Sequence, residues 1–140
     1  MFSSKTDQWA TPQDFFDELN LEFHFTLDPC ADKDNHKCKK YFTKEDDGLQ
    51  QDWGGETVFC NPPYGRNLTG QWVKKASEEI NKPGTTVVLL LPSRTDTKWF
   101  HDYLYKKDNV ELRFVKGRLK FGDGKNSAPF GSLIAVMKSE

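Results

Sequence analysis

The sequence has no long apolar run, few cysteines and almost no net charge. No apolar run is longer than that of residues 87–91, which is far short of the roughly 20 residues that a membrane-spanning helix needs. The N-terminus has no apolar stretch of signal-peptide length, so we expect a cytoplasmic protein that neither enters a membrane nor is exported. Three cysteines without a C-x-x-C spacing argue against a disulfide scaffold and indicate a reducing compartment.

The 20 basic and 21 acidic side chains leave a formal charge of −1, but they are unevenly distributed. Residues 1–60 carry six lysines and 13 acidic residues, a net charge of −7. Residues 61–140 carry 14 basic and eight acidic residues, a net charge of +6. A basic half is suited to phosphate groups and an acidic half to a cationic or hydroxyl-rich ligand, with chance scatter as the alternative.

The length of 140 residues, without a repeat or linker, predicts one domain over residues 1–140. Helices are expected from the Thr11 region, where Thr11, Pro12 and Asp14 have capping-box spacing, and again around residues 72–80 and 99–104. Residues 32–51 read as a loop with a short helical piece. We expect strands at residues 23–27, 57–60, 86–91, 110–115, 118–121 and 133–137. This alternation predicts an α/β fold with a mostly parallel sheet.

The most informative stretch is the tetrapeptide Asn61, Pro62, Pro63 and Tyr64, which follows a predicted buried strand. Two prolines fix the backbone in an extended form and donate no N–H groups. The Asn61 carboxamide and the Pro62 carbonyl are then two acceptors, and Tyr64 is a flat ring. This set suits a planar group with an exocyclic amine, whereas the plainer alternative is a stiff turn with an exposed tyrosine.

Three polar positions follow predicted strands, namely Asp28, Asn61 and the pair Ser93-Arg94. In a parallel α/β sheet the ligand lies beyond the carboxyl ends of the strands. We therefore expect these side chains to share one edge of the sheet.

The tetrapeptide resembles the catalytic motif of amino-methyltransferases that use S-adenosylmethionine. With the other motifs in their order, nearly the whole chain resembles the compact DNA N-6-adenine methyltransferase family of bacteriophages and prophages. The further motifs are Trp9-x-Thr11-Pro12, Thr26-Leu27-Asp28-x-Cys30-Ala31, Asn35-x-x-Cys38-x-x-Tyr41, Asp47-Gly48-Leu49 with Trp53, Arg94-Thr95-Asp96-Thr97-x-Trp99-Phe100-His101, Gly117-Arg118 and Ala128-Pro129-Phe130.

The resemblance implies a compact Rossmann-like methyltransferase fold with helices on both faces of the sheet. It implies methyl transfer from S-adenosylmethionine to the N-6 amine of a flipped adenine in double-stranded DNA, in a bacterial host and in the setting of restriction–modification. Other planar amines (cytosine N-4, RNA adenine, a glutamine amide) and a non-catalytic nucleic-acid-binding module stay open, as does a homodimer.

The resemblance also implies which residues bind the cofactor. Asp28, Cys30 and Ala31 stand at the first cofactor motif, although no G-x-G follows. Thr11 and Pro12 precede a helix whose N-terminal N–H groups would face the carboxylate of the cofactor. Asn61 adjoins the same cofactor site. Asp47 is our choice for reading the adenosine, and its rivals are Asp46, Asp52 and Asn35.

Residues of the basic half are expected to hold the DNA. The tetrapeptide's Tyr64 and the later Phe130 would stack on the flipped base, and Arg118 and Lys120, with Lys125, would contact phosphates. Arg94 would hold a phosphate or orient the tetrapeptide loop. The plainer alternative is a basic surface hairpin with Phe130 in the core.

The sequence does not predict a zinc site. Cys30, His36, Cys38 and Cys60 lack the paired-cysteine spacing of structural zinc sites.

Overall fold

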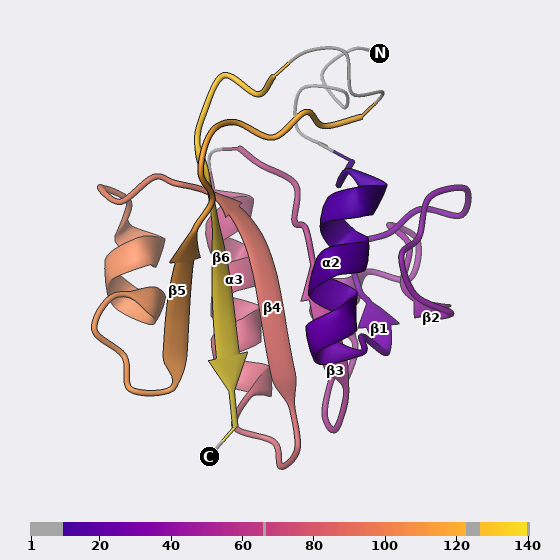
Figure 1. Cartoon of the computed structure of the whole chain (residues 1–140). Coiled ribbons are helices and arrows are strands. Elements are labelled where there is room, and N and C mark those ends of the chain that lie inside the picture. Colours follow the sequence, from indigo (N-terminus) through magenta and orange to yellow (C-terminus); the bar gives the residue numbers. More distant parts are fainter. Residues whose placement is uncertain (1–9, 66, 123–126, 140) are drawn as a thin grey trace.

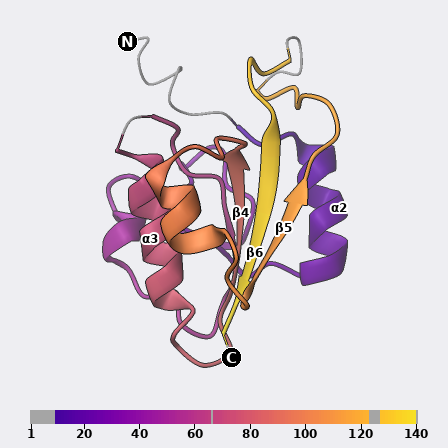
Figure 2. The ribbon, with the colours of Figure 1, turned by 90° about the vertical axis from the view of Figure 1, so that its left-hand side faces the viewer.

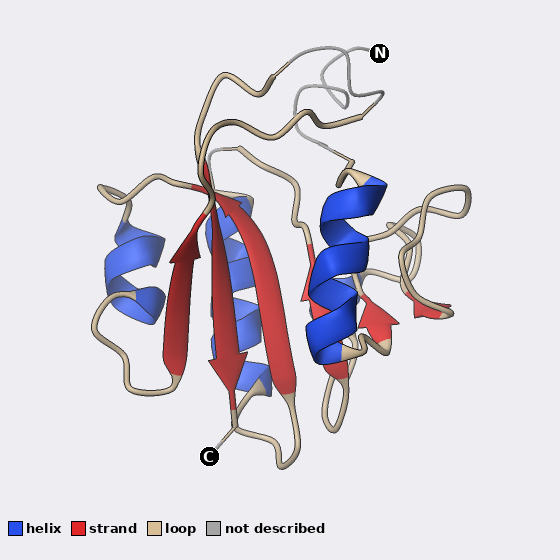
Figure 3. Cartoon of the chain, viewed as in Figure 1, coloured by secondary structure: helices blue, strands red, loops and turns tan. Residues whose placement is uncertain are grey.

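The computed structural model describes residues 10–65, 67–122 and 127–139, which form one sheet flanked by helices (Figures 1 and 3). The motif residue Trp9 and the phosphate candidate Lys125 lie outside the described residues. The sheet has six strands in the order β2-β1-β3-β4-β6-β5. Their bounds are Leu27–Asp28 (β1), Lys40–Tyr41 (β2), Thr57–Cys60 (β3), Thr86–Pro92 (β4), Val110–Phe114 (β5) and Ser132–Lys138 (β6).

Only β6 runs against the rest of this sheet. The pairs β1–β2, β1–β3 and β3–β4 are parallel, and β6 pairs antiparallel with both β4 and β5. β5 therefore points the same way as β4, and the carboxyl ends of these strands share one edge. The predicted α/β fold with a mostly parallel sheet is confirmed.

Helices cover both faces of the sheet, as Figure 2 shows edge-on. Helix α2 (Gln13–Phe23) packs on one face, and α3 (Thr69–Glu79) lies on the other face with the short π-helix η2 (Phe100–Leu104). The loop of residues 32–51 contains the 3-10 turn η1 (Gly48–Gln50) and, unpredicted, the edge strand β2.

The side chains of β4 divide between two cores. Val88 and Leu90 pack with Phe16 of α2 and Phe59 of β3, whereas the alternate residues of β4 pack under α3. Burial of each such side chain stabilises the fold by about 1.5–3 kcal/mol. A central strand buried on both faces accounts for the continuous apolar run in the sequence.

Three predicted local features are wrong. Thr11 does not cap α2, because Pro12 occupies the capping position and the Asp14 carboxylate accepts from the next backbone N–H. Residues 23–26 are not part of a strand, since α2 runs to Phe23 and His24 turns the chain at φ 56°, so the strand expected at residues 23–27 is limited to β1 at Leu27–Asp28. Residues 118–121 form no strand either, and their apolar pattern reflects packing of Phe121 into the α2-side core.

Among the described residues, no helix combines the length and the apolar character needed to cross a membrane.

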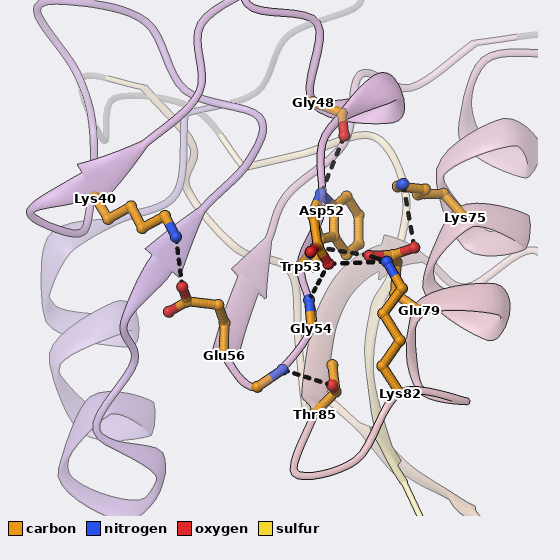
Figure 4. A network of polar contacts seen from close by, with 11 residues as sticks. Lys40, Gly48, Asp52, Trp53, Gly54, Glu56, Lys75, Glu79, Lys82 and Thr85 are labelled. Carbon is orange, nitrogen blue, oxygen red and sulfur yellow. Dashed lines mark hydrogen bonds and ion pairs between the residues drawn. The ribbon is translucent and has the colours of Figure 1, made fainter.

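A buried carboxylate joins α3 to the segment before β3 (Figure 4). Glu79 Oε1 accepts a hydrogen bond from the Trp53 backbone N–H at 2.6 Å and from Lys82 Nζ at 2.9 Å, and its other oxygen pairs with Lys75 at 3.3 Å. Burial would raise the pKa of Glu79, but the bonds from Lys82, Trp53 and Lys75 outweigh it and lower that pKa.

We predict that Glu79→Ala lowers the free energy of unfolding by about 2–3 kcal/mol at neutral pH, because the Trp53 N–H loses its acceptor inside the fold. The loss should shrink as the pH falls through the lowered pKa of Glu79, where the carboxylate is already protonated. Urea denaturation measures both. The exposed neighbour Glu78 is the control, and Glu78→Ala should stay within about 0.5 kcal/mol. Equal effects of the two substitutions would contradict the prediction.

Candidate active site

The tetrapeptide of residues 61–64 separates two cavities at the carboxyl edge of the sheet. Asn61 and Pro63 line a cavity of about 680 Å³, which we call the Asp28 cavity. Tyr64 lines a second cavity of about 860 Å³, the Tyr64 cavity. A short segment directly after β3 thus contributes to both.

The Asp28 cavity gathers most of the residues predicted to bind a cofactor. Thr11, Asp28, Cys30, Ala31, Asp47 and Asn61 all line it, whereas Pro12 does not. Its charged lining consists of four acidic residues and two lysines, which are Asp28, Asp32, Glu45, Asp47, Lys37 and Lys44. The cavity therefore favours a ligand with positive charge and hydroxyl groups.

Asp28 is a buried carboxylate held by backbone amides at the end of β1. Its Oδ2 accepts from the Lys37 N–H at 2.9 Å and its Oδ1 from the Cys30 N–H at 3.3 Å. Burial raises the pKa of Asp28, although these two bonds oppose the shift. A partly desolvated carboxylate of this kind would gain from a cationic group in the cavity.

The structure separates the four candidates for reading an adenosine. Asp47 and Asn35 line the Asp28 cavity. Asp46 instead accepts bonds from the backbone N–H and hydroxyl of Thr43, at 2.9 and 3.0 Å. Asp52 lies in the Glu79 network (Figure 4), where it pairs with Lys82 at 2.8 Å.

Gly48 and Trp72 also line this cavity, although the sequence predicted no role there for either residue. A Cβ atom on Gly48 would lie 2.1 Å from the Pro29 carbonyl oxygen, so only glycine allows this approach. Trp53 stacks behind Trp72 and donates its indole N–H to the Gly48 carbonyl at 3.0 Å. Gly48 could have been predicted from its place in the Asp47-Gly48-Leu49 motif. The spacing of Trp72 is typical of an ordinary core residue of a helix, so nothing in the sequence marks it as part of a cavity.

Thr11 contacts the tetrapeptide rather than the helix that it precedes. The Asn61 Nδ2 atom donates to the Thr11 hydroxyl at 2.9 Å. This bond orients the Asn61 carboxamide, because it assigns the nitrogen to the Thr11 side.

Tyr64 is buried, contrary to an exposed turn tyrosine, and its hydroxyl donates to the Leu90 carbonyl of β4 at 3.1 Å. Its ring meets Phe130 edge to face, with centroids 5.4 Å apart and planes at 67°. Both rings line the Tyr64 cavity. A base sandwiched between them would require the two rings to separate from this contact.

The Tyr64 cavity is lined by three basic side chains and one acid. Lys98 pairs with Asp102, while Lys74 and Arg94 have no acidic partner among the described residues. Arg118 and Lys120 line neither cavity and lie in the exposed loop between β5 and β6, where Arg118 donates to the Ala128 carbonyl at 3.4 Å. Of the predicted phosphate contacts that the structure describes, Arg94 alone lines a cavity that the tetrapeptide also lines.

No three histidine, cysteine or acidic side chains within the described part of the chain are grouped to hold a metal ion. Cys60 is fully buried in β3, and burial raises the pKa of Cys30 to about 12, as it does that of Cys38. These cysteines are protonated, unreactive thiols at neutral pH.

A mostly parallel sheet with cavities at its carboxyl edge, where α/β proteins commonly bind ligands, is compatible with a methyltransferase-like fold. Residues 1–138 match the model of the family "DNA N-6-adenine-methyltransferase (Dam)". The chain belongs to this family, which confirms the resemblance inferred from the motifs.

Two phage proteins are similar to the chain. It is 38% identical over 99 residues to the DNA N-6-adenine-methyltransferase of Haemophilus phage HP1, which covers 69% of this chain and 56% of that protein. It is 33% identical over 133 residues to the DNA N-6-adenine-methyltransferase of Escherichia phage T1, which covers 93% of this chain and 54% of that protein. The chain spans about half the length of these curated relatives.

We predict that Gly48→Ala lowers the free energy of unfolding by about 1–3 kcal/mol, because the new Cβ atom overlaps the Pro29 carbonyl. Denaturation measures the loss. Gly131→Ala is the matched control, since its Cβ atom would lie 3.7 Å from the Ser93 hydroxyl, an ordinary contact. Equal stability of the two variants would show that the approach of Gly48 to Pro29 is not obligatory.

Proposed function

We propose that this chain transfers a methyl group from S-adenosylmethionine to the N-6 amine of adenine in double-stranded DNA. The observation that carries the proposal is the position of the tetrapeptide between an acidic cavity and a cavity with aromatic and basic lining. Family membership and the named phage relatives support it.

The donor set of the Asp28 cavity fits S-adenosylmethionine. Asp28 would hold the ammonium of the methionine group, and Asp47, with Asn35, would accept from ribose hydroxyls or the adenine amine. Cys30 and Ala31, which also line the cavity, would contact the methionine group beside Asp28, and Thr11, with Pro12 before α2, would face the carboxylate end. When bound, the cofactor supplies an electrophilic methyl group.

Asn61 and Pro62 would prepare the acceptor amine. The nitrogen of an aromatic amine is a weak nucleophile, because its lone pair is delocalised into the ring. Acceptance of its two N–H bonds by the Asn61 carboxamide oxygen and the Pro62 carbonyl draws that lone pair toward the methyl group. The amine nitrogen then forms its bond to carbon as the sulfur–carbon bond breaks, and one N–H proton leaves to solvent. Thr11 is a positioning residue, since it acts through Asn61.

The adenine must leave the duplex to reach the tetrapeptide, which costs a few kcal/mol of stacking and pairing. Tyr64 and Phe130 would offset part of this cost by stacking on the base. Arg94 would hold a phosphate beside the Tyr64 cavity, while Arg118 and Lys120 would contact the backbone of the surrounding duplex.

Transfer of radiolabelled methyl from S-adenosylmethionine to unmethylated duplex DNA, followed by nucleoside analysis, tests the proposal. We expect N-6-methyladenine, and we expect Asn61→Ala to reduce its formation by about 100-fold or more while cofactor binding persists. Asn81→Ala is the control, since Asn81 is exposed beyond the end of α3. If the label appears on cytosine, RNA or protein instead, the proposed acceptor, adenine in DNA, is wrong. Cofactor binding without any methyl transfer would favour the non-catalytic module.

Cofactor affinity should also depend on the ionisation of Asp28. Only the carboxylate form holds an ammonium, and burial raises the pKa of Asp28 above the usual aspartate value. We therefore expect the affinity for S-adenosylhomocysteine to fall, as the pH is lowered from neutral, before an ordinary aspartate would be protonated. Calorimetry measures this, with circular dichroism to show that the chain stays folded. An affinity that holds down to the ordinary aspartate range would contradict the role of Asp28.

A further inference from the structure

The side chain of Lys37 lies where the first turn of α2 meets the Asp28 cavity. Its ammonium donates a hydrogen bond to Gln13 Oε1 at 2.8 Å, and Gln13 Nε2 donates to Asp17 Oδ1 at 2.8 Å. Lys37 is also one of the two lysines that line the cavity. Two successive hydrogen bonds, from Lys37 to Gln13 and from Gln13 to Asp17, therefore hold the Lys37 ammonium at the end of the cavity where α2 begins.

This cation is half-buried, and among the described residues no carboxylate oxygen lies within 4.0 Å of it. Loss of water lowers the pKa of Lys37, against the opposing effect of Asp28 and Asp17. Its one hydrogen-bond partner among the described residues is the neutral amide oxygen of Gln13, and it also lies 6.0 Å from the centre of the Phe16 ring. An ammonium has three N–H donors, so donors remain available. Such a group gains more from a bound anion than a fully hydrated lysine does, because part of its desolvation has already occurred.

The same residue also fixes the opposite charge. The backbone N–H of Lys37 donates to Asp28 Oδ2 at 2.9 Å, so an anion and a cation are presented to one cavity from adjoining positions. An α-amino acid carries an ammonium and a carboxylate on one carbon atom. The pair formed by Asp28 and Lys37 is therefore complementary in charge to the amino-acid end of a ligand.

We propose that Lys37 binds the carboxylate of the methionine group of S-adenosylmethionine, beside the ammonium held by Asp28. This assignment rests on the proposed function and adds a specificity-determining residue to it. Lys44, the other lysine of the cavity lining, provides a matched control. It is exposed and follows Thr43 in the loop that leads to Asp47, so it belongs to the adenosine end.

The test compares two ligands, S-adenosylmethionine and its decarboxylated form, which lacks only the carboxylate. Calorimetry with the unmodified chain should give tighter binding of S-adenosylmethionine by about tenfold or more, the range of a hydrogen bond between charged groups. Lys37→Met should remove this preference by weakening S-adenosylmethionine alone. Lys37→Arg should restore part of it, and Lys44→Met should leave it unchanged.

The outcomes separate this assignment from the proposed function. If the unmodified chain binds neither ligand, both are overturned. If the unmodified chain binds both ligands equally, the carboxylate assignment alone is wrong. If Lys37→Met weakens both ligands by the same factor, the assignment is also wrong, and Lys37 has a structural role. A loss of preference in Lys44→Met equal to that in Lys37→Met would move the carboxylate away from Lys37.

Discussion

A single buried hydrogen bond, from the Tyr64 hydroxyl to the Leu90 carbonyl, fixes the wall between the two cavities. Leu90 belongs to the central strand, so this wall has the same rigidity as the core. Breaking such a bond inside the fold costs about 1–3 kcal/mol, which keeps the tyrosine ring from turning outward. The bonds of Asn61 to Thr11 and of Pro63 to Thr69 attach the same segment to the start of α2 and to α3. Asn61 and Pro63 are thereby held at the Asp28 cavity and Tyr64 at the Tyr64 cavity, whereas Pro62 lines neither.

The uneven charge of the sequence corresponds to a spatial division. Every charged residue that lines the Asp28 cavity comes from residues 1–60, and four of the six are acidic. Every charged residue that lines the Tyr64 cavity comes from residues 61–140, and three of the four are basic. A near-zero net charge therefore combines an acidic cavity, which favours positive charge, with a basic cavity, which favours negative charge, and one tetrapeptide contributes to both.

Patterns that depend on burial were predictable, and those that depend on distant partners were not. Strand β4 was found because a strand buried on both faces must be apolar throughout, and the edge position of Asp28 and Asn61 followed from strand order. Thr11 misled the prediction because its hydroxyl serves Asn61, 50 residues away, instead of its own helix. Phe121 led to the wrong strand prediction because a buried side chain in an irregular loop gives the same apolar pattern as a short strand. Asp47 was the preferred candidate from the sequence, but only the structure shows that Asp47 lines the Asp28 cavity whereas Asp52 pairs with Lys82, since their spacing along the chain does not separate them.

The stacked pair of Trp53 and Trp72 has a spectroscopic consequence. Trp72 is in the wall of the Asp28 cavity, and the ring of Trp53 lies 6.2 Å behind it at an angle of 22°. Two indoles this close share their excitation, and both are shielded from solvent. Anything that enters the cavity changes the surroundings of the first indole and thereby the emission of the pair. The fold thus contains an intrinsic fluorophore at the cavity, so occupancy can be followed without attaching a label.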